Sequence, residues 1–146
     1  MARIDLAGAR VAVGKPTTYM NLSGRFVSGM TRYFKVEPED TLAVYDDVDL
    51  PLGTLKLARA GGTAGHKGVK SIIEQLGTRD FPRLRIGIGK PEGARDVSGY
   101  VLGRFSDAEL TIVAQVVEEA LAAIRTWTEE GIEGAMNKHN GCKTVD

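Results

Sequence analysis

The residues of this chain that could do chemistry begin with a glycine-rich segment that runs straight into a helix. Residues 61–68 read Gly-Gly-Thr-Ala-Gly-His-Lys-Gly, and apolar residues at helical spacing follow. The first turn of a helix has N–H groups without intrahelical partners and the positive end of the helix dipole, so it suits a phosphate or another anion. The spacing fits neither the dinucleotide-binding fingerprint nor the Walker lysine loop, and we set both of those functions aside.

A second group of reactive side chains is the acidic run Asp46, Asp47 and Asp49, which follows a short buried strand expected over residues 41–45. Ligands of α/β sheets tend to bind at the carboxyl ends of strands. Clustered carboxylates also bind hard cations, but this run lacks the glycine and glutamate spacing of a calcium loop. We therefore expect no metal here, and we expect Asp49 to cap the turn at Pro51.

The composition indicates one compact domain with a sizeable core. The chain has 146 residues, of which 42% are hydrophobic, and its 19 basic and 19 acidic residues give a formal net charge of zero. No global field therefore indicates a nucleic-acid partner, although a local basic patch stays open. The single cysteine, Cys142, has no second cysteine for a disulfide or a zinc site. The sequence has no apolar run as long as a membrane span and no apolar signal segment, so we expect a cytoplasmic protein with no membrane partner.

The elements that must position the reactive residues alternate between period two and period 3.6, which is typical of a three-layer α/β domain. Strands are expected over residues 9–13, 41–45, 54–59 and 83–90. Polar helix-start residues at 21–24 precede an apolar helical face that ends near Lys35. A second helix follows the glycine-rich segment and is expected to bury Val69, Ile72, Ile73 and Leu76.

The last part of the chain is expected to be a long helix. Ser106-Asp107-Ala108-Glu109 forms a capping box, and Gly131 stops the helix before a short amphipathic segment over residues 132–138. One face carries an apolar stripe that we assign to the core, namely Leu110, Val113, Val117, Leu121, Ile124 and Trp127. A polar tail follows, in which we expect His139 to be exposed to solvent.

Arg83 and Arg85 share the polar face of the strand expected over residues 83–90, opposite an apolar face. That polar face could meet an RNA backbone. The alternative is that both arginines are solvated charges at a sheet edge.

With these elements placed, the chain resembles the bacterial-type peptidyl-tRNA hydrolase family in five blocks that occur in order. They are Lys-Pro-Thr-Thr-Tyr-Met-Asn-Leu-Ser-Gly at residues 15–24, Tyr-Asp-Asp-Val-Asp-Leu-Pro-Leu-Gly at 45–53, the glycine-rich segment at 61–68, Leu-Gly-Thr-Arg-Asp-Phe-Pro-Arg-Leu-Arg-Ile-Gly-Ile-Gly at 76–89, and Tyr-Val-Leu at 100–102 before Phe105. Together they cover most of residues 10–110.

The resemblance implies a single domain over residues 1–146 with a mixed, mostly parallel central sheet. It also implies cleavage of the ester between a peptide and the 3′ ribose of tRNA, with no metal or organic cofactor. Members of the family use a histidine as general base on water, an aspartate that orients it, and asparagines that hold the substrate. Asp46 matches the orienting aspartate, and Asn21 matches a substrate-holding asparagine. A carboxylate bonded to imidazole fixes the ring tautomer and stabilises the imidazolium ion that forms when water is deprotonated.

Further contacts follow from the same resemblance. We expect Tyr19, His66 and Lys67 to bind substrate, although His66 as a helix cap and Lys67 as a solvated lysine are the alternatives. The basic residues that are candidates for contacting phosphates of the tRNA acceptor stem are Lys90, Arg95, Arg104 and Lys138. The expected protein is a monomer that acts on peptidyl-tRNA in translation.

The chain departs from the family pattern in three places. Family members open with a strand of the type Val-Gly-Leu-Gly-Asn-Pro-Gly and a Thr-Arg-His-Asn segment that carries the histidine base, whereas only residues 1–8 precede the first matched strand here. We therefore expect a chain truncated at its N-terminus, through a misplaced start or trimming, with a genuine variant that lacks the usual base as the alternative. Lys67 stands where an asparagine is usual, and Ala64 stands where a second glycine is frequent.

Two functions of different classes stay open. The first is an enzyme, a carboxylic-ester hydrolase acting on peptidyl-tRNA. Asp46 and Asn21 favour it, because a pure binding protein has no evident need for an aspartate at a strand end. The second is a hydrolase-like RNA-binding protein without catalysis, and the missing histidine segment favours that function.

Overall fold

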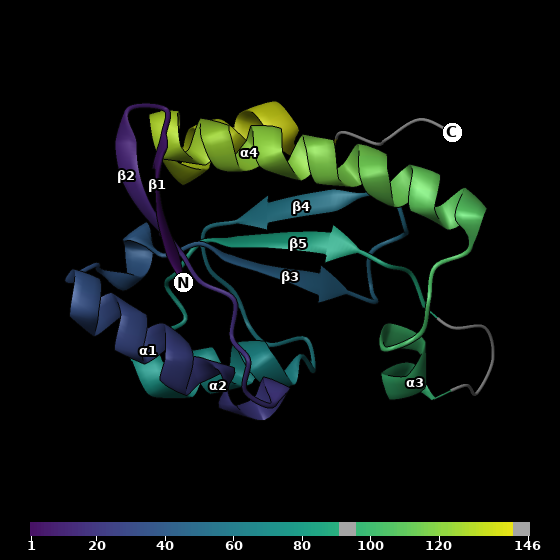
Figure 1. Ribbon diagram of the computed structural model, residues 1–146, viewed down its shortest axis with the longest axis horizontal. Coiled ribbons are helices and arrows are strands. Elements are labelled where there is room, and N and C mark those ends of the chain that lie inside the picture. The colour runs from purple at the N-terminus through teal and green to yellow at the C-terminus, as the bar shows by residue number, and fades with distance from the viewer. Residues whose placement is uncertain (91–95, 142–146) are drawn as a thin grey trace. The chain divides into compact units, whose positions relative to one another are not determined.

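The computed structural model describes residues 1–90 and 96–141, which fold into two compact units (Figure 1). Met1–Ala43 and Ala58–Pro82 form the first unit, and Val44–Leu57 and Arg83–Asp146 form the second. Arg95 and Cys142, on which the sequence carries predictions, lie outside the described residues. The single domain over residues 1–146 stays a prediction.

The first unit opens with a β-hairpin of β1 (Ala2–Leu6) and β2 (Ala9–Val13). The register leaves a two-residue loop, and both of its residues, Ala7 (φ 51°) and Gly8 (φ 78°), have the positive φ of the tight turn that matches strand twist. β2 confirms the strand expected over residues 9–13. β1 lies where the sequence analysis expects no strand, although the polar and apolar alternation of residues 3–6 is a signal for one.

Two helices form the body of the first unit. α1 (Ser23–Phe34) ends at Lys35 as expected, and α2 (Lys67–Leu76) ends at Gly77. The helices pack against each other, and the backbone N–H of Gly24 donates to Oγ of Ser71 at 2.9 Å. The expected polar cap of α1 is wrong, because the short 3₁₀ turn η1 (Met20–Leu22) leads into the helix and no side chain caps it.

A mixed three-stranded sheet is the centre of the second unit. Its strands are β3 (Ala43–Asp47), β4 (Leu55–Ala58) and β5 (Arg83–Gly87), in the order β3-β5-β4. β5 runs parallel to β3 and antiparallel to β4 (Figure 1). An α/β fold with a mixed sheet is therefore confirmed. β3 starts two residues later than expected (Ala43, not residue 41), so Asp46 and Asp47 belong to the strand itself.

α4 (Asp107–His139) covers one face of this sheet, and the short helix α3 (Val97–Val101) precedes it (Figure 1). The capping box is confirmed, since Oγ of Ser106 accepts from the N–H of Glu109 at 3.2 Å and the Glu109 carboxylate accepts from the N–H of Ser106 at 2.9 Å. Gly131 (φ 81°) interrupts the helical backbone as expected. α3 lies where the sequence analysis expects no helix.

The buried face of α4 differs from the predicted apolar stripe. Leu110, Val117 and Leu121 are exposed, whereas Val116 and the alanines at 120 and 123 are buried. The prediction is wrong for these three exposed residues, whereas Val113, Ile124 and Trp127 of the same stripe are half-buried, because α4 carries apolar residues on more than one side. Helical periodicity alone does not say which side meets the sheet.

His139 is buried, at 8% exposure, and not part of a solvated tail. Its Nδ1 lies 2.7 Å from Oε1 of Glu119, and its Nε2 lies 2.8 Å from Oγ1 of Thr126. Oγ1 of Thr126 also lies 3.0 Å from the carbonyl oxygen of Ala122. The prediction is wrong because the chain changes direction at Gly131, which lets a residue of the last turn contact the middle of α4.

Asn140 pairs with the edge of the sheet. Strand β4 stands at the end of the order β3-β5-β4, and its residue Leu57 is fully buried. Oδ1 of Asn140 accepts from the N–H of Leu57 at 2.7 Å, and Nδ2 of Asn140 donates to the carbonyl of Leu57 at 2.9 Å. The amide thus takes the place of a neighbouring strand at a backbone that would otherwise be a template for pairing with other chains.

Replacing Asn140 should therefore destabilise the protein. In Asn140→Ala both backbone groups of Leu57 lose their partners, and we expect the free energy of unfolding to fall by about 1–3 kcal/mol, measured by urea denaturation. Asn137→Ala is the control, because Asn137 is exposed in the same final turns and alanine favours helix. An equal loss in both variants would show that the contact with Leu57 contributes nothing.

Candidate functional site

The predicted site residues divide between the two units. The first unit holds Tyr19, Asn21, His66 and Lys67. The second unit holds Asp46, Lys90, Arg104 and Lys138.

The first unit brings its predicted substrate-binding residues to one place. η1, which carries Asn21, packs against α2, whose start is formed by His66 and Lys67. The approach is so close that a Cβ on Gly68 would lie 2.5 Å from Sδ of Met20. Asn21 and Lys67 are exposed, as is Tyr19 directly before η1, so their polar groups are open to a ligand.

His66 is the N-cap of α2. Its Nδ1 accepts from the N–H of Gly68 at 3.1 Å and from the N–H of Val69 at 3.3 Å. With Nδ1 occupied as an acceptor, the proton of the neutral ring sits on Nε2, which can only donate. His66 therefore fits the capping alternative, and its ring is set up as a hydrogen-bond donor and not as a general base.

The cap also changes the anion site expected from the glycine-rich segment. Two of the first N–H groups of α2 already have an acceptor in His66, so they are not available to a phosphate while the cap is intact. The turn before the helix is tight, with the N–H of His66 donating to the carbonyl of Thr63 at 2.8 Å. Ala64 has a φ of 45° there, a left-handed conformation that costs a residue with a Cβ about 1–2 kcal/mol.

We expect the cap to be measurable as stability. His66→Ala removes the acceptor, and the free energy of unfolding should fall by about 1 kcal/mol, as is usual for a lost helix cap. His66→Asn keeps a side-chain acceptor and should recover most of that loss in the same urea titration. If asparagine and alanine destabilise equally, the hydrogen bonds from Gly68 and Val69 are not what His66 contributes.

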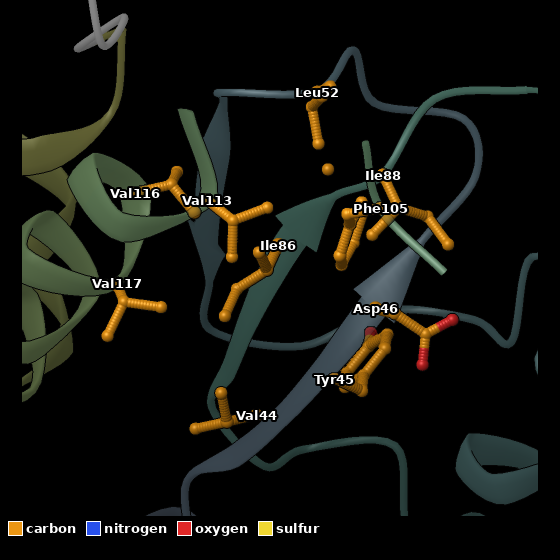
Figure 2. Close-up of a pocket in the computed structure, with 11 residues that line it drawn as sticks. Val44, Tyr45, Asp46, Leu52, Ile86, Ile88, Phe105, Val113, Val116 and Val117 are labelled. Atoms are coloured by element: carbon orange, nitrogen blue, oxygen red, sulfur yellow. The ribbon is translucent and has the colours of Figure 1, made fainter. Parts of the chain in front are cut away.

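Asp46 lies at the rim of an apolar cavity of about 370 Å³ in the second unit (Figure 2). The cavity is lined from β3 and β5 by Val44 and Ile86 and from α4 by Val113, among others. In Figure 2 the carboxylate of Asp46 points away from the α4 valines. Asp46 is partly buried and stands beside an otherwise apolar lining. Among residues 1–90 and 96–141 no group of three or more His, Cys, Asp or Glu side chains is placed to hold a metal ion.

The neighbouring Asp47 has a structural role. It is 7% exposed, its Oδ2 lies 2.6 Å from Nε of Arg85, and its Oδ1 accepts from the N–H of Asp49 at 2.8 Å. Arg85 is 22% exposed and Arg83 only 1%. The solvated-edge alternative is wrong, because β5 is the central strand of the sheet. The RNA-facing alternative is wrong for the buried Arg83 and stays a prediction for the half-buried Arg85.

The predicted tRNA-binding lysines already have carboxylate partners. Nζ of Lys90 lies 2.8 Å from Oδ1 of Asp49, and Lys138 pairs with Glu130, while Arg104 is exposed. A phosphate that binds either lysine must compete with these carboxylates.

The turn at Pro51 is closed by Thr54, whose hydroxyl donates to the Pro51 carbonyl at 2.6 Å, so the expected cap by Asp49 is wrong.

The exposed Asp49–Lys90 pair predicts a pH dependence with a definite sign. The hydrogen bond from Lys90, and then its charge, lower the pKa of Asp49 from its ordinary value of 3.8. Because the folded-state pKa is lowered, the pair's contribution is present above pH 3.8 and is lost as the pH falls through the lowered pKa.

Removing the charge of Lys90 should abolish the lowering of the Asp49 pKa. In Lys90→Met the pKa of Asp49 should return toward 3.8, as followed by the carboxyl ¹³C resonance in an NMR titration. Lys56→Met, which removes an exposed cation from β4, is the control and should leave the titration unchanged. High salt should act in the same direction as Lys90→Met, because exposed charges are screened. An unchanged pKa in Lys90→Met contradicts the assignment.

Comparison with known proteins gives one family. The family model described as peptidyl-tRNA hydrolase matches residues 1–146. The peptidyl-tRNA hydrolase of Syntrophomonas wolfei is 49% identical over 126 residues, which cover 86% of this chain and 68% of that protein. The peptidyl-tRNA hydrolase of Desulfitobacterium hafniense is 41% identical over 140 residues, covering 96% of this chain and 76% of that protein.

Solved structures agree. A crystal structure of peptidyl-tRNA hydrolase from Acinetobacter baumannii is similar with a TM-score of 0.89 and 33% identity, over 97% of this chain and 71% of that one. A peptidyl-tRNA hydrolase crystallised with N-propanol has a TM-score of 0.90 and 33% identity, over 98% of this chain and 72% of that one. No helix in the described part of the chain is long and apolar enough to cross a membrane.

Proposed function

Because the chain belongs to the peptidyl-tRNA hydrolase family, we propose that it hydrolyses the ester joining a peptide to the 3′ ribose of tRNA, as a monomer in the cytoplasm. The observation that carries the proposal is the family match over the whole chain. The position of Asp46 near the carboxyl end of β3 supports it, since ligands of α/β sheets bind at such ends. Hydrolysis of this ester frees tRNA for translation.

The reaction requires a proton to move from water to a base. Water adds to the ester carbonyl carbon as the base takes its proton, the bond from that carbon to the ribose oxygen breaks, and the ribose oxygen takes up a proton. Asp46 is proposed to accept a hydrogen bond from the imidazole that acts as base. This contact would orient the ring and stabilise its charged form in the transition state.

The two histidines of this chain are not suited to be that base. Nδ1 of His66 accepts two backbone N–H groups, which leaves its Nε2 protonated. Both ring nitrogens of His139 are in hydrogen bonds, to Glu119 and to Thr126. We therefore assign the base to neither His66 nor His139.

The remaining predicted residues would hold the substrate. The exposed amide of Asn21 can donate to or accept from the peptide or the ester without titrating, and Nε2–H of His66 can donate. Tyr19 and Lys67 are exposed beside them. The phosphates of tRNA are assigned to Lys90, Arg104 and Lys138, and to Arg95 outside the described residues, through contacts that weaken with salt.

An added imidazole should reveal the role of Asp46. We expect the purified chain to hydrolyse N-blocked aminoacyl-tRNA slowly, and millimolar imidazole to accelerate the reaction by acting as the base. In Asp46→Asn the acceleration by imidazole should fall by about tenfold or more, within the usual range for an acid or base partner. The measurement is the release of the blocked amino acid over time.

Asp5→Asn is the matched control, since it makes the same charge change on exposed strand β1. It should respond to imidazole as the unmodified chain does. If the chain hydrolyses the substrate no faster than buffer alone, both with and without imidazole, the proposal that it is an enzyme is wrong. If the chain then still binds tRNA with an affinity that falls with salt, its function is that of a non-catalytic RNA-binding protein.

A further inference from the structure

We propose that the exposed face of α1 binds the phosphates of double-helical RNA, with Arg25 and Arg32 as its contacts. The inference rests on the function proposed above in one respect, that the partner is RNA. It adds a surface on the first unit to the phosphate contacts of Lys90, Arg104 and Lys138, which belong to the second unit.

The net charge of zero is made up of two opposite charges, one on each unit. The first unit has ten Lys and Arg against six Asp and Glu, a net charge of +4. The second unit has nine against thirteen, a net charge of −4. A local excess of positive charge attracts a polyanion even where the whole chain is neutral. The distribution of charge therefore favours the first unit as a surface for phosphates.

The arginines of α1 are available to a phosphate. Arg25 and Arg32 are exposed, α1 contains no acidic residue, and neither arginine has an ion-pair partner in the part of the chain that the structure describes. Lys90 and Lys138, in contrast, are each paired with a carboxylate. A phosphate that binds the α1 arginines therefore displaces no carboxylate.

The two arginines share one face of the helix. Arg25, Gly29 and Arg32 are spaced i, i+4 and i+7, which places them in a row about 10 Å long along the helix axis. The exposed residues of α1 are these three and Tyr33, so the helix offers no aliphatic side chain that would enter a membrane. The chemistry of the face favours a hydrated polyanion such as RNA.

Gly29 lies between the arginines in this row. A glycine in an exposed helix interior is less stable than an alanine. A Cβ on Gly29 would meet nothing within 4 Å, so packing in this chain does not require the glycine. What the glycine does is leave the helix backbone uncovered between two cations, where a ribose-phosphate chain can approach closely.

The second helix extends the basic surface. The N–H of Gly24 donates to Oγ of Ser71 at 2.9 Å, and the next residue of one helix, Arg25, and the preceding residue of the other, Lys70, are both exposed. Cations thus flank the contact between α1 and α2. Cations fixed on two packed helices suit the regular phosphate rows of an RNA duplex, which proteins recognise mainly by shape and backbone contacts.

The first test measures binding to a synthetic RNA hairpin with a base-paired stem and a single-stranded CCA end, by fluorescence anisotropy over a range of salt concentrations. In the double variant Arg25→Gln, Arg32→Gln we expect the affinity to fall by about tenfold, and the slope of log affinity against log salt to decrease by about two. Arg125→Gln, which removes an exposed arginine from α4 of the second unit, is the control and should change the affinity by less than about twofold.

A variant without a charge change tests the approach at Gly29. Gly29→Leu keeps both arginines and favours the helix, yet its side chain fills the gap between them, so the affinity for the hairpin should fall. Unchanged affinity and salt slope in a folded Arg25→Gln, Arg32→Gln variant would show that α1 does not bind RNA. Binding to vesicles of phosphatidylcholine and phosphatidylserine through these arginines, without binding to the hairpin, would make the surface a membrane contact and the proposal wrong.

The second test is imidazole-supported hydrolysis of an N-blocked aminoacyl ester carried either by the hairpin or by the trinucleotide CCA. The Arg25→Gln, Arg32→Gln variant should raise KM for the hairpin ester by about tenfold and leave kcat, and both constants for the trinucleotide ester, within about twofold. An equal loss on both esters would contradict a contact with the duplex. Absence of hydrolysis in the unmodified chain would count against the proposed enzyme alone, since binding of the hairpin still decides the role of α1.

Discussion

The buried carboxylate of Asp47 is the constraint on which the second unit depends. A charge at 7% exposure must be paired and hydrogen-bonded, and Arg85 and the N–H of Asp49 meet that requirement. The pairing joins β3 to β5, the central strand of the described sheet. Asp46, the residue before Asp47 in β3, is partly buried at the rim of an apolar cavity. Arg85, for which the sequence offers a place in solvent or against RNA, thus pairs with Asp47 and joins two strands of the sheet.

A similar use of polar groups explains the end of α4. Gly131 allows a sharp change of direction, and the residues after it are held by His139 against Glu119 and by Asn140 against the backbone of Leu57. Both contacts satisfy groups that are buried by the fold itself. The chain thereby uses one of its two histidines for structure, and the other, His66, caps α2. A ring nitrogen that is already in a hydrogen bond is not available to accept a proton from water. The residue type alone therefore does not identify a base in this chain, and the hydrogen bonds of each histidine must be considered.

The first unit shows what can be expected of a glycine-rich segment before a helix. Such a segment indicates an anion site because the first N–H groups of the helix lack partners. Here His66 supplies those partners, so the same residues form a capped helix start that packs against the turn carrying Asn21. The structure gathers Asn21, His66 and Lys67 within this unit, while the first N–H groups of α2 are occupied by the His66 cap.

The sequence by itself determined the family, the α/β class, the strand at residues 9–13, the end of α1, the capping box and the break at Gly131. These features depend on local backbone preferences or on blocks of residues with fixed spacing, and both are readable along the chain. The tertiary structure alone decided that Arg83 and His139 are buried, that Arg85 pairs with the buried Asp47, and which side of α4 meets the sheet. Burial and pairing depend on which strand is central and on contacts between residues up to 83 positions apart, such as Asn140 with Leu57, and local sequence patterns carry no information on either.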